Sequence, residues 1–480
     1  MFVVKLNKTQ FEYDIHSIVK AFYPEKDVKV LTPDSVYKDK EWFHKEPDMF
    51  IDFSEDKIDV KALKSYFKEL SDSDKAYKDE FKKFLYICLC EETGKELPWG
   101  NLTGIRPTKI AMGMLENGQS DDEILEYMKK EHFVSAEKAE LSLDIAKREK
   151  SLLDTLHYEN GYSLYIGIPF CPTTCLYCSF TSYPICSWKT KMDQYLDAVF
   201  KEIDFVAEAY KDKILDTVYI GGGTPTTLEA EELDRLISKV KSAFNFETVK
   251  EFTVEAGRAD SITYEKLKVL KKHNVSRISV NPQTMKEETL KIIGRRHTVS
   301  DVMEAFHMAR EIGFDNINMD IILGLPGEME EDVSYTMEEI KKLNPDSLTV
   351  HSLAIKRASR LHSWIMENGI ATLNNTDKTM EIAAKAAEDM ELKPYYLYRQ
   401  KNMSGNFENV GYAYPGKEGI YNILIMEEKQ TIVALGAGSI TKVVLPDGRI
   451  ERCDNVKDVG LYIEKIDEMI ERKKTLFEIV

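Results

Sequence analysis

The stretch that decides how this chain folds is Tyr165-Ile-Gly-Ile-Pro-Phe-Cys171-Pro-Thr-Thr-Cys175-Leu-Tyr-Cys178-Ser-Phe180. A β-like run stops at the first proline and is followed by three cysteines, separated by three and then by two residues. Thiolates are soft ligands that suit iron–sulfur clusters, and three of them leave the fourth iron of a cluster open. Because an open iron can coordinate and activate a bound molecule, the spacing indicates chemistry rather than electron storage alone.

Other uses of these cysteines compete with a reactive cluster. A structural zinc site needs a fourth nearby Cys or His, and the next candidate is Cys186, which could equally close the fourth iron of an electron carrier. A chain of this size with few cysteines has no need of disulfides, and the cysteine usage favours a reducing compartment. We expect the four scattered cysteines to be small buried side chains. They are Cys88, Cys90, Cys186 and Cys453.

Composition limits the class of protein. The chain has 480 residues, of which 43% are hydrophobic and 10% aromatic, and this predicts two or three domains with their own cores. The formal net charge of -17 argues against a general nucleic-acid surface, because phosphate binding depends on clustered Lys and Arg. No apolar run approaches the roughly 20 residues of a membrane span, and no signal-like leader is recognised. We therefore expect a cytoplasmic protein that neither binds nucleic acid nor spans a membrane.

Residues 156–357 alternate β-rich runs with amphipathic segments, which is the pattern of parallel β/α units in an α/β fold. Strands are predicted at 162–168, 216–220, 251–255, 276–280, 316–323 and 347–351. Helices are predicted at 192–206, 231–244, 264–272, 301–312 and 332–343. Six units make a partial (β/α)6 barrel, in which reactive groups lie at the carboxyl ends of the strands.

The flanking segments are predicted to be separate domains. Residues 1–155 predict an N-terminal α+β domain, with Ser120 and Glu123 forming a capping box at the start of one helix. Strand-like pieces lie at 2–6, 28–31 and 49–53. The loop 99–109, rich in turn-forming residues and carrying Arg106 and Lys109, is either a domain connection or a ligand contact. Residues 358–480 predict a C-terminal α/β extension with a Gly-rich turn at 435–440, a hairpin at 446–449 and a final helix.

Glycines and carboxylates follow the predicted strands. Gly221–Gly223 end the second strand and are followed by Thr224, so the backbone there can approach a ligand closely. Glu255 ends the third strand, where a carboxylate can accept hydrogen bonds from ribose hydroxyls. Gln283 follows the fourth strand, with Arg295 twelve residues later, and Asp320 lies in the fifth strand.

Taken together and in this order, the motifs resemble the radical S-adenosylmethionine (radical SAM) enzymes, and among them the oxygen-independent coproporphyrinogen III oxidases. The motifs are YIGIPFCPTTCLYCSF, GGGTPT, the Gln and Arg twelve apart, NMDIILGLPG and the late LGAGSI. The GIRPTK loop and residues 399–411 are also similar to the HemZ branch, so the resemblance extends over nearly the whole chain.

The resemblance implies a set of site residues. Cys171, Cys175 and Cys178 would bind a 4Fe–4S cluster. One SAM molecule would contact Tyr165, Gly222, Glu255, Ala354 and Ile440. A second SAM-associated set falls on Tyr177, Gly223, Thr224, Gln283, Arg295 and Asp320. Tyr165, Arg295 and Asp320 would also be catalytic, and whether one or two SAM molecules bind stays open.

The implied reaction is oxidative decarboxylation of two propionates of coproporphyrinogen III to vinyl groups, with a small redox protein as electron donor. The substrate carries four carboxylates, so local cations are needed in an acidic protein. The candidates are Arg106, Arg258, Arg295, Arg296, Lys356, Arg357 and Arg399.

Two departures from the family keep other functions open. The oxidases place a fourth cysteine where this chain has Phe180. The related heme chaperones bind heme through an HNxxYW motif, and the comparable segment here begins Glu408-Asn409 and lacks both the His and the Trp. The alternatives are heme trafficking by a protein of the same fold and a different radical reaction on a tetrapyrrole.

Overall fold

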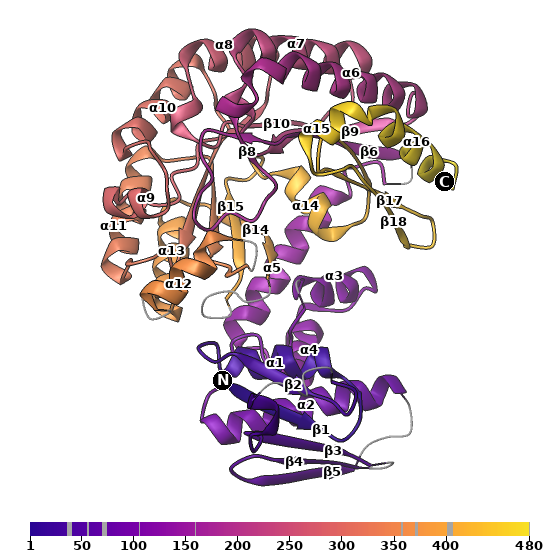
Figure 1. Cartoon of the computed structure of the whole chain (residues 1–480), viewed down its shortest axis with the longest axis vertical. Coiled ribbons are helices and arrows are strands. Elements are labelled where there is room, and N and C mark those ends of the chain that lie inside the picture. The colour runs from indigo at the N-terminus through magenta and orange to yellow at the C-terminus, as the bar shows by residue number, and fades with distance from the viewer. Residues whose placement is uncertain are drawn as a thin grey trace. The chain divides into compact units, whose positions relative to one another are not determined.

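The computed structural model describes residues 1–35, 41–54, 57–69, 74–104, 106–158, 160–356, 359–369, 373–400 and 407–479 (Figure 1). The chain divides into two compact units. Unit 1 consists of Met1–Lys147 with Leu397–Glu408, and unit 2 of Arg148–Tyr396 with Asn409–Val480. The three domains predicted at 1–155, 156–357 and 358–480 stay a prediction.

Unit 1 contains a five-stranded sheet in the order β2-β1-β3-β4-β5. The three strands predicted here are confirmed as β1 (Phe2–Leu6), β2 (Val28–Leu31) and β3 (Met49–Phe53). The antiparallel strands β4 (Lys57–Lys61) and β5 (Ser65–Glu69) extend the sheet beyond the prediction. Alternate side chains of β3 and β4 are buried, as expected for a sheet with one covered face.

Helices complete unit 1. They are α1 (Glu12–Phe22), α2 (Asp74–Thr93), α3 (Thr108–Glu116) and α4 (Asp121–His132), and α5 (Ala136–Leu153) runs on into unit 2. The predicted capping box is confirmed, because the Glu123 amide donates to the Ser120 hydroxyl at 3.4 Å and the Ser120 amide donates to the Glu123 carboxylate at 2.8 Å.

The centre of unit 2 is a parallel sheet made of the six predicted strands. They are β6 (Gly161–Ile168), β9 (Ile214–Gly222), β10 (Glu251–Glu255), β11 (Arg277–Ser279), β12 (Ile317–Leu323) and β13 (Ser347–Ser352). Each pairs in parallel with its neighbour along the chain, so all six carboxyl ends lie at one edge. The partial barrel predicted from the sequence is confirmed.

Helices cover the outer face of this sheet in an arc, as Figure 1 shows. They are α6 (Met192–Ala209), α7 (Ala230–Ala243), α8 (Tyr264–Lys272), α9 (Glu287–Ile292), α10 (Val299–Ile312) and α11 (Glu330–Leu343). The apolar stripe of α6 explains why it packs there, since Leu196, Val199, Ile203 and Val206 recur at helical spacing and are all fully buried.

Later segments extend the sheet at both ends to eleven strands, in the order β14-β15-β13-β12-β11-β10-β9-β6-β16-β17-β18. The added strands are β14 (Lys393–Tyr398), β15 (Asn409–Ala413), β16 (Thr431–Leu435), β17 (Ile440–Val444) and β18 (Ile450–Asp454). β15 runs antiparallel to β13, whereas β16 runs parallel to β6. The predicted hairpin at 446–449 is confirmed, because it joins β17 to β18.

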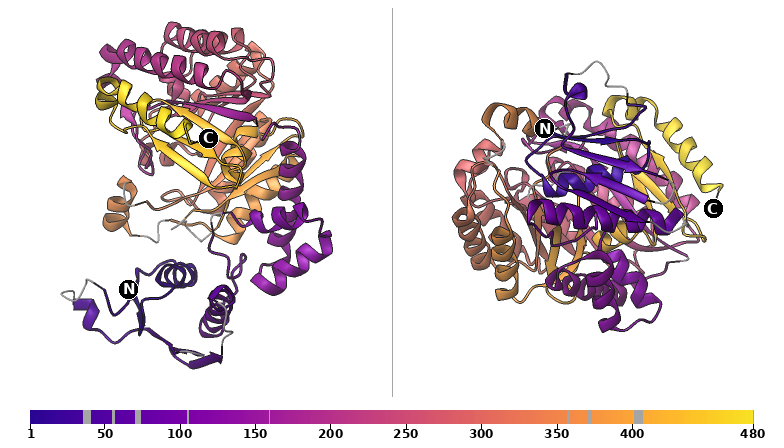
Figure 2. Two further views of the ribbon diagram at one scale, coloured as in Figure 1. Left: turned by 90° about the vertical axis from the view of Figure 1, so that its right-hand side faces the viewer. Right: turned by 90° about the horizontal axis from the view of Figure 1, so that it is seen from below.

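The last helices are α12 (Arg360–Asn368), α13 (Asp377–Asp389), α14 (Ile420–Glu427), α15 (Val459–Glu464) and α16 (Ile466–Phe477). The two views of Figure 2 place α16 beside α6, and the two helices are in contact. The C-terminal segment therefore closes onto the first β/α unit of the barrel.

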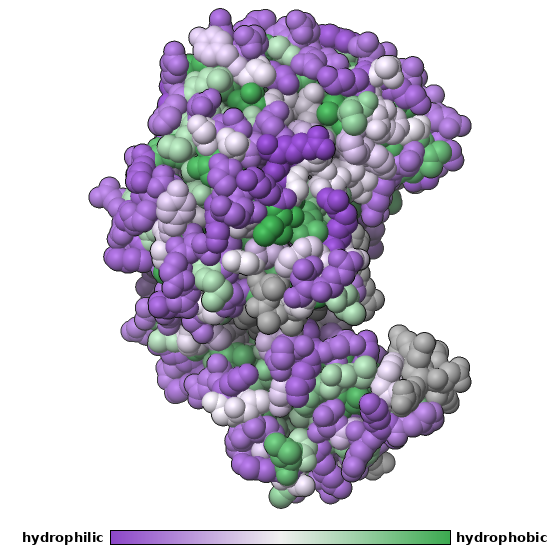
Figure 3. All heavy atoms as spheres, turned by 60° about the vertical axis from the view of Figure 1, so that its left-hand side comes forward, coloured by the Kyte–Doolittle hydropathy of each residue, from purple (hydrophilic) through white to green (hydrophobic). Residues whose placement is uncertain are grey.

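The surface is largely hydrophilic. On the face in Figure 3 hydrophilic side chains predominate, and hydrophobic ones form small separate patches. Among the described helices, none is both long and apolar enough to cross a membrane. One expectation about cysteines is wrong: Cys88 and Cys453 are buried and Cys90 is half-buried, but Cys186 is exposed, because it lies in a short 3-10 turn on the surface.

Candidate functional site

The loop with the three cysteines leaves the carboxyl end of β6 through the short strand β7 (Phe170–Cys171). Neighbouring segments fix its backbone. The Leu176 amide donates to the Ile293 carbonyl at 2.9 Å, and the Leu361 amide donates to the Leu176 carbonyl at 2.9 Å. The loop is therefore held between the turn after α9 and the start of α12, which gives the thiols defined positions.

The three thiols differ in their surroundings. Cys175 is buried and lies 3.8 Å from the guanidinium of Arg258, measured from Sγ to Nη1. Cys171 and Cys178 are half-buried, and the Cys171 sulfur is 3.5 Å from the hydroxyl of Thr224. Burial raises the pKa of the Cys171 and Cys178 thiols, so a metal that binds them has to displace protons.

The glycine segment at the end of β9 lies directly against this loop. The Gly223 amide donates to the Ile168 carbonyl at 2.8 Å, and the Thr224 amide donates to the Phe170 carbonyl at 2.7 Å. A Cβ at Gly223 would come within 2.5 Å of the Phe170 carbonyl oxygen, and Gly222 has a φ of 114°. Only glycine fits at these two positions, which explains why the sequence has a glycine run at this strand end.

Glu255 lies at the end of β10 and is hydrogen-bonded by the hydroxyl of Tyr219. The pKa of the Glu255 carboxyl is raised to about 7, mainly by burial, with the nearby charge of Asp320 acting in the same direction. Hydrogen bonds from the Tyr219 hydroxyl and the Gly222 amide act in the opposite direction. Burial also acts to raise the pKa of Asp320, but interactions with His351 and Asn318 outweigh it and hold that pKa below its usual value. The two carboxyl groups therefore titrate in different pH ranges, which is typical of functional sites.

Three tyrosines form a stack beside Glu255. The rings of Tyr219 and Tyr421 are 4.4 Å apart between centroids, and Tyr165 lies 6.1 Å from each of them. Tyr421 comes from α14, in the C-terminal part of the chain. Sequence reasoning missed it, because nothing in that apolar helix distinguishes a site residue from a core residue.

The remaining residues of the second predicted set lie beside β11 and β12. Gln283 is buried with a φ of 67°, and its amide donates to the Asp320 carbonyl at 2.9 Å. Arg295 is buried and donates to the hydroxyl of Tyr177 at 3.3 Å and to the Asn281 carbonyl. A buried glutamine with positive φ is strained by about 1–3 kcal/mol, and such strain tends to occur at functional sites.

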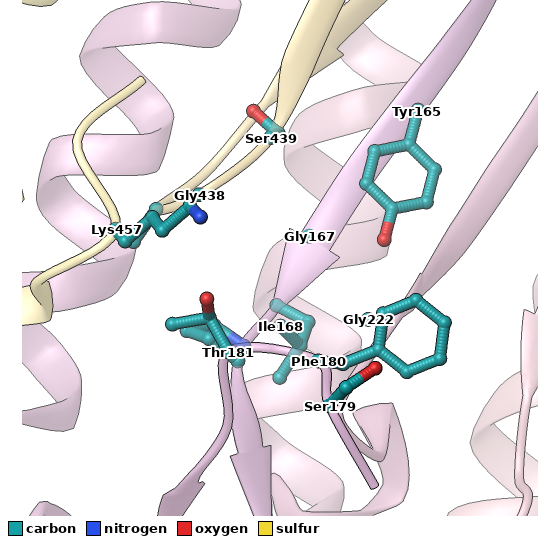
Figure 4. A pocket seen from close by; sticks show the side chains of 12 residues that line it. Tyr165, Gly167, Ile168, Ser179, Phe180, Thr181, Gly222, Gly438, Ser439 and Lys457 are labelled. Carbon is teal, nitrogen blue, oxygen red and sulfur yellow. The ribbon is translucent and has the colours of Figure 1, made fainter. Parts of the chain in front are cut away.

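A cavity of about 220 Å³ opens beside the carboxyl end of β6 (Figure 4). Its lining residues are Tyr165, Gly167, Ile168, Pro169, Ser179, Phe180, Thr181, Gly222, Ala437, Gly438, Ser439 and Lys457. In Figure 4 Lys457 lies opposite Tyr165 and Phe180, and its ammonium group points toward the space between them. Lys457 was missed from the sequence, since it lies in an ordinary polar segment after β18.

The predicted residues thus divide into two groups. Tyr165 and Gly222 line the cavity, whereas Glu255, Gln283, Arg295 and Asp320 are not among its lining residues. Ala354 follows β13 and is half-buried. Ile440 begins β17 next to the cavity residue Ser439, and 44% of its surface is exposed.

The sequence pattern of the Radical SAM superfamily matches residues 165–340. The oxygen-independent coproporphyrinogen-III oxidase-like protein HemZ of Bacillus subtilis is 41% identical over 433 residues, which cover 87% of this chain and 86% of that protein. The chain belongs to the HemZ family of radical SAM proteins. The family resemblance read from the motifs is therefore confirmed.

Two further groups of proteins are similar to this HemZ-family chain. The heme chaperone HemW of Bacillus subtilis is 32% identical over 309 residues, covering 64% of this chain and 76% of that protein. The oxygen-independent coproporphyrinogen III oxidase of Salmonella typhimurium is 32% identical over 314 residues, covering 65% of this chain and 66% of that protein. The solved structure of coproporphyrinogen III oxidase (HemN) from Escherichia coli covers 67% of this chain and 72% of its own, with 23% identity and a TM-score of 0.52, and supports the fold.

Membership of the radical SAM superfamily implies a 4Fe–4S cluster and SAM, and the donor atoms at this site fit both. Three thiols lie on one fixed loop, and the glycine segment, which has no side chains in the way, packs its backbone against that loop. Among the described residues, no three His, Cys, Asp or Glu side chains could share a single metal ion. A cluster takes each thiolate on a different iron, so its ligands need not converge on one point.

Proposed function

We propose that this HemZ-family chain is a radical SAM oxidoreductase of porphyrin biosynthesis, which decarboxylates two propionates of coproporphyrinogen III to vinyl groups and yields protoporphyrinogen IX. The observation that supports this most is the connection of the cysteine loop to the glycine segment through the Thr224 amide, 2.7 Å from the Phe170 carbonyl. It brings together the groups that a cluster and a bound SAM would each need. Relatives named coproporphyrinogen III oxidase support the choice of substrate.

Each part of the site has a proposed role. When bound, the cluster and SAM supply a 5′-deoxyadenosyl radical, which can remove an unactivated hydrogen atom. Cys171, Cys175 and Cys178 would hold the cluster. Tyr165, Gly222, Glu255, Ala354 and Ile440 would contact one SAM molecule. Tyr177, Gly223, Thr224, Gln283, Arg295 and Asp320 would form the second SAM-associated set.

The protein itself positions the reacting groups and keeps water away. Glu255 can accept hydrogen bonds from ribose hydroxyls, and the stacked rings of Tyr219 and Tyr421 fill the space beside it that water would otherwise occupy. Removal of a hydrogen atom from the propionate carbon next to the pyrrole, loss of carbon dioxide and transfer of one electron to an acceptor would complete each vinyl group. We propose a small redox protein as electron donor and the cytoplasm as the location.

The proposed substrate needs cations for its carboxylates, and the candidates differ in accessibility. Arg296 is exposed, and the Lys356 ammonium lies 5.6 Å from the ring of Phe180, which is 73% exposed. Arg258 is buried, and Arg399 is buried within unit 1, where it donates to a backbone carbonyl. The other candidates are Arg295, which is buried, Arg106, which lies in unit 1, and Arg357, which lies outside the described residues.

An anaerobic assay tests the proposal. The reconstituted and reduced protein is given SAM and coproporphyrinogen III, and 5′-deoxyadenosine and porphyrin mass are followed together. We expect substrate-dependent 5′-deoxyadenosine with stepwise loss of two carboxyl groups. Cleavage of SAM with an unchanged porphyrinogen would reject the substrate, and a different change of product mass would point to another radical reaction on a tetrapyrrole.

Two adjacent arginines provide a matched pair of variants for this assay. Arg295 is buried against Tyr177 at the site, whereas Arg296 is exposed. Arg295→Ala is expected to lower turnover by roughly 100-fold or more at unchanged cluster content, because it removes a positioned cation. Arg296→Ala is expected to change turnover at most a few-fold. Wild-type activity in Arg295→Ala would remove that residue from the site.

Heme trafficking is the second candidate, favoured by the HemW relatives and by Phe180 in place of a fourth cysteine. The segment of this chain that corresponds to the heme-binding motif of the chaperones gives heme trafficking little support. Asn409 is buried at the start of β15, where its side chain accepts a hydrogen bond from the Ser352 amide at 2.9 Å. Stoichiometric heme binding without porphyrinogen-dependent 5′-deoxyadenosine would favour trafficking over catalysis.

A further inference from the structure

Arg258 does not have the surroundings of a substrate-binding cation. It follows β10, and only 4% of its side chain is exposed. Its Nη1 atom lies 3.8 Å from the sulfur of Cys175 and donates to the carbonyl and the hydroxyl of Thr173, both at 2.8 Å. Its other two nitrogens donate to the Asp260 carboxylate, at 2.9 Å from Nε and 2.6 Å from Nη2. The guanidinium is thus fully engaged between a carboxylate and the cysteine loop.

This arrangement places a fixed positive charge beside one cluster ligand. Arginine stays protonated at any pH of interest, and a buried charge acts more strongly than an exposed one because water does not screen it. The bidentate pairing with Asp260 keeps the guanidinium plane in one orientation. The two N–H groups of Nη1 are left to face the cysteine loop and Cys175.

A cation and a hydrogen bond at a ligand sulfur favour the reduced cluster, because reduction adds one negative charge to it. Hydrogen bonds to the sulfurs and the net charge nearby are among the factors that set the potentials of such clusters. Asp260 has the opposite effect, since its carboxylate offsets part of the positive charge. Arg295 also interacts with Cys175. The Arg258–Asp260 pair therefore adds its own contribution to the potential, as a difference between two opposed charges.

We propose that Arg258, with Asp260 as its counter-ion, is a positioning residue that sets the reduction potential of the cluster held through Cys175, an inference that rests on the proposed cluster site. The residue acts through the ligand and does not touch substrate. Its charge makes the cluster easier to reduce, and its hydrogen bonds to Thr173 keep the loop in place.

The test is a redox titration of the reconstituted holoprotein, followed by the EPR signal of the reduced cluster. Arg258→Gln is expected to lower the equilibrium constant for reduction by about tenfold, which is about 59 mV toward more negative potential for one electron. Asp260→Asn keeps the arginine and removes the counter-charge, so its potential is expected to move in the positive direction. Arg258→Lys keeps the charge and is expected to stay closer to the wild type than Arg258→Gln.

The opposite directions of the two expected shifts in potential distinguish an electrostatic role of Arg258 from a purely structural one. A residue that only held the loop would lower iron content in both variants and leave the potential of the remaining clusters unchanged. Because a midpoint potential does not depend on the amount of cluster, partly loaded variants still give a result. Equal shifts in the same direction, or no shift in either variant, would overturn the inference.

The same experiment keeps this inference apart from the proposed function. If the wild-type protein forms no 4Fe–4S signal, the cluster site itself is rejected. If the wild type shows the signal and its potential is unmoved in both variants, only the role of Arg258 is rejected.

Discussion

Two buried glutamates in unit 2 differ in how fully their carboxylates are satisfied. Glu202, on α6, accepts hydrogen bonds from Lys473 at 2.6 Å, Asn455 at 2.8 Å, the Gly436 amide at 2.9 Å and Tyr462 at 2.5 Å. Glu202 and Lys473 are both fully buried, and Lys473 also donates to Asn455. This carboxylate has a partner on every side.

Glu255 is less completely satisfied. It accepts hydrogen bonds from the Tyr219 hydroxyl and the Gly222 amide but faces a second carboxylate, Asp320, and its pKa is raised to about 7, mainly by burial. A closed polar network rigidifies its surroundings, whereas a buried group with spare hydrogen-bonding capacity is ready for a ligand. Glu202 therefore supports the fold by fixing the turn at Gly436. The surroundings of Glu255 fit the ligand-binding role proposed for it.

The largest effect on stability is expected when one partner is removed from the hydrogen-bonded network around Glu202. Lys473→Met leaves the Glu202 carboxylate buried without its cation, which should lower the free energy of unfolding by about 3–5 kcal/mol. Chemical denaturation measures it. The double variant Glu202→Gln with Lys473→Met removes both charges and is expected to regain most of the loss. A double variant as unstable as the sum of the singles would show that the two residues act independently.

The second effect concerns the pH dependence of stability and comes from Glu255. Its pKa in the folded state, about 7, is above the usual value of 4.5, so the folded protein binds the proton more tightly than the unfolded chain. Stability from this group is complete below about pH 4.5 and is lost as the pH rises through 7. Between pH 5 and 8 the wild type should lose roughly 2–3 kcal/mol relative to Glu255→Gln. The free energy of unfolding of each protein is measured by chemical denaturation at several pH values between 5 and 8. An equal change with pH in the two proteins would contradict this prediction.

The smallest effects test the neighbours of Glu255. The Tyr219 hydroxyl lowers the pKa of Glu255, and the Asp320 charge raises it. Tyr219→Phe should therefore move the pH-dependent loss of stability to higher pH, and Asp320→Asn should move it to lower pH. Each substitution is expected to change the pH-dependent part of the free energy of unfolding by about 1 kcal/mol, which is comparable with one hydrogen bond. Shifts in the same direction would mean that the two groups do not act on Glu255 as described.

The sequence predicted the barrel well, because apolar stripes and β-rich runs depend on neighbours close along the chain. The helices at 231–244 and 264–272 begin within about one residue of α7 and α8. The hairpin that joins β17 to β18 was predicted, but β14, β15 and β16 were not, nor was the pairing of the added strands with the sheet. Their partners lie far away in the sequence, and β16 contains no signal that it pairs with β6.

The candidate site shows the same division. Cys171, Gly223 and Glu255 stand at strand ends within recognisable motifs, so their positions could be read from spacing. Tyr421 and Lys457 reach the site only through the fold of the last part of the chain. The surroundings of Arg258 also had to be seen, since a sequence does not reveal whether a cation faces solvent or a buried sulfur.

The pairing of β16 with β6 also bears on how the protein is made. Ser163 on β6 and Gln430 just before β16 are hydrogen-bonded at 2.9 Å although they are 267 residues apart. During translation β6 therefore cannot form its pairing with β16 until residues 431–435 have been synthesised. The cysteine loop that follows β6 is thus synthesised well before the strand that closes this edge of the sheet.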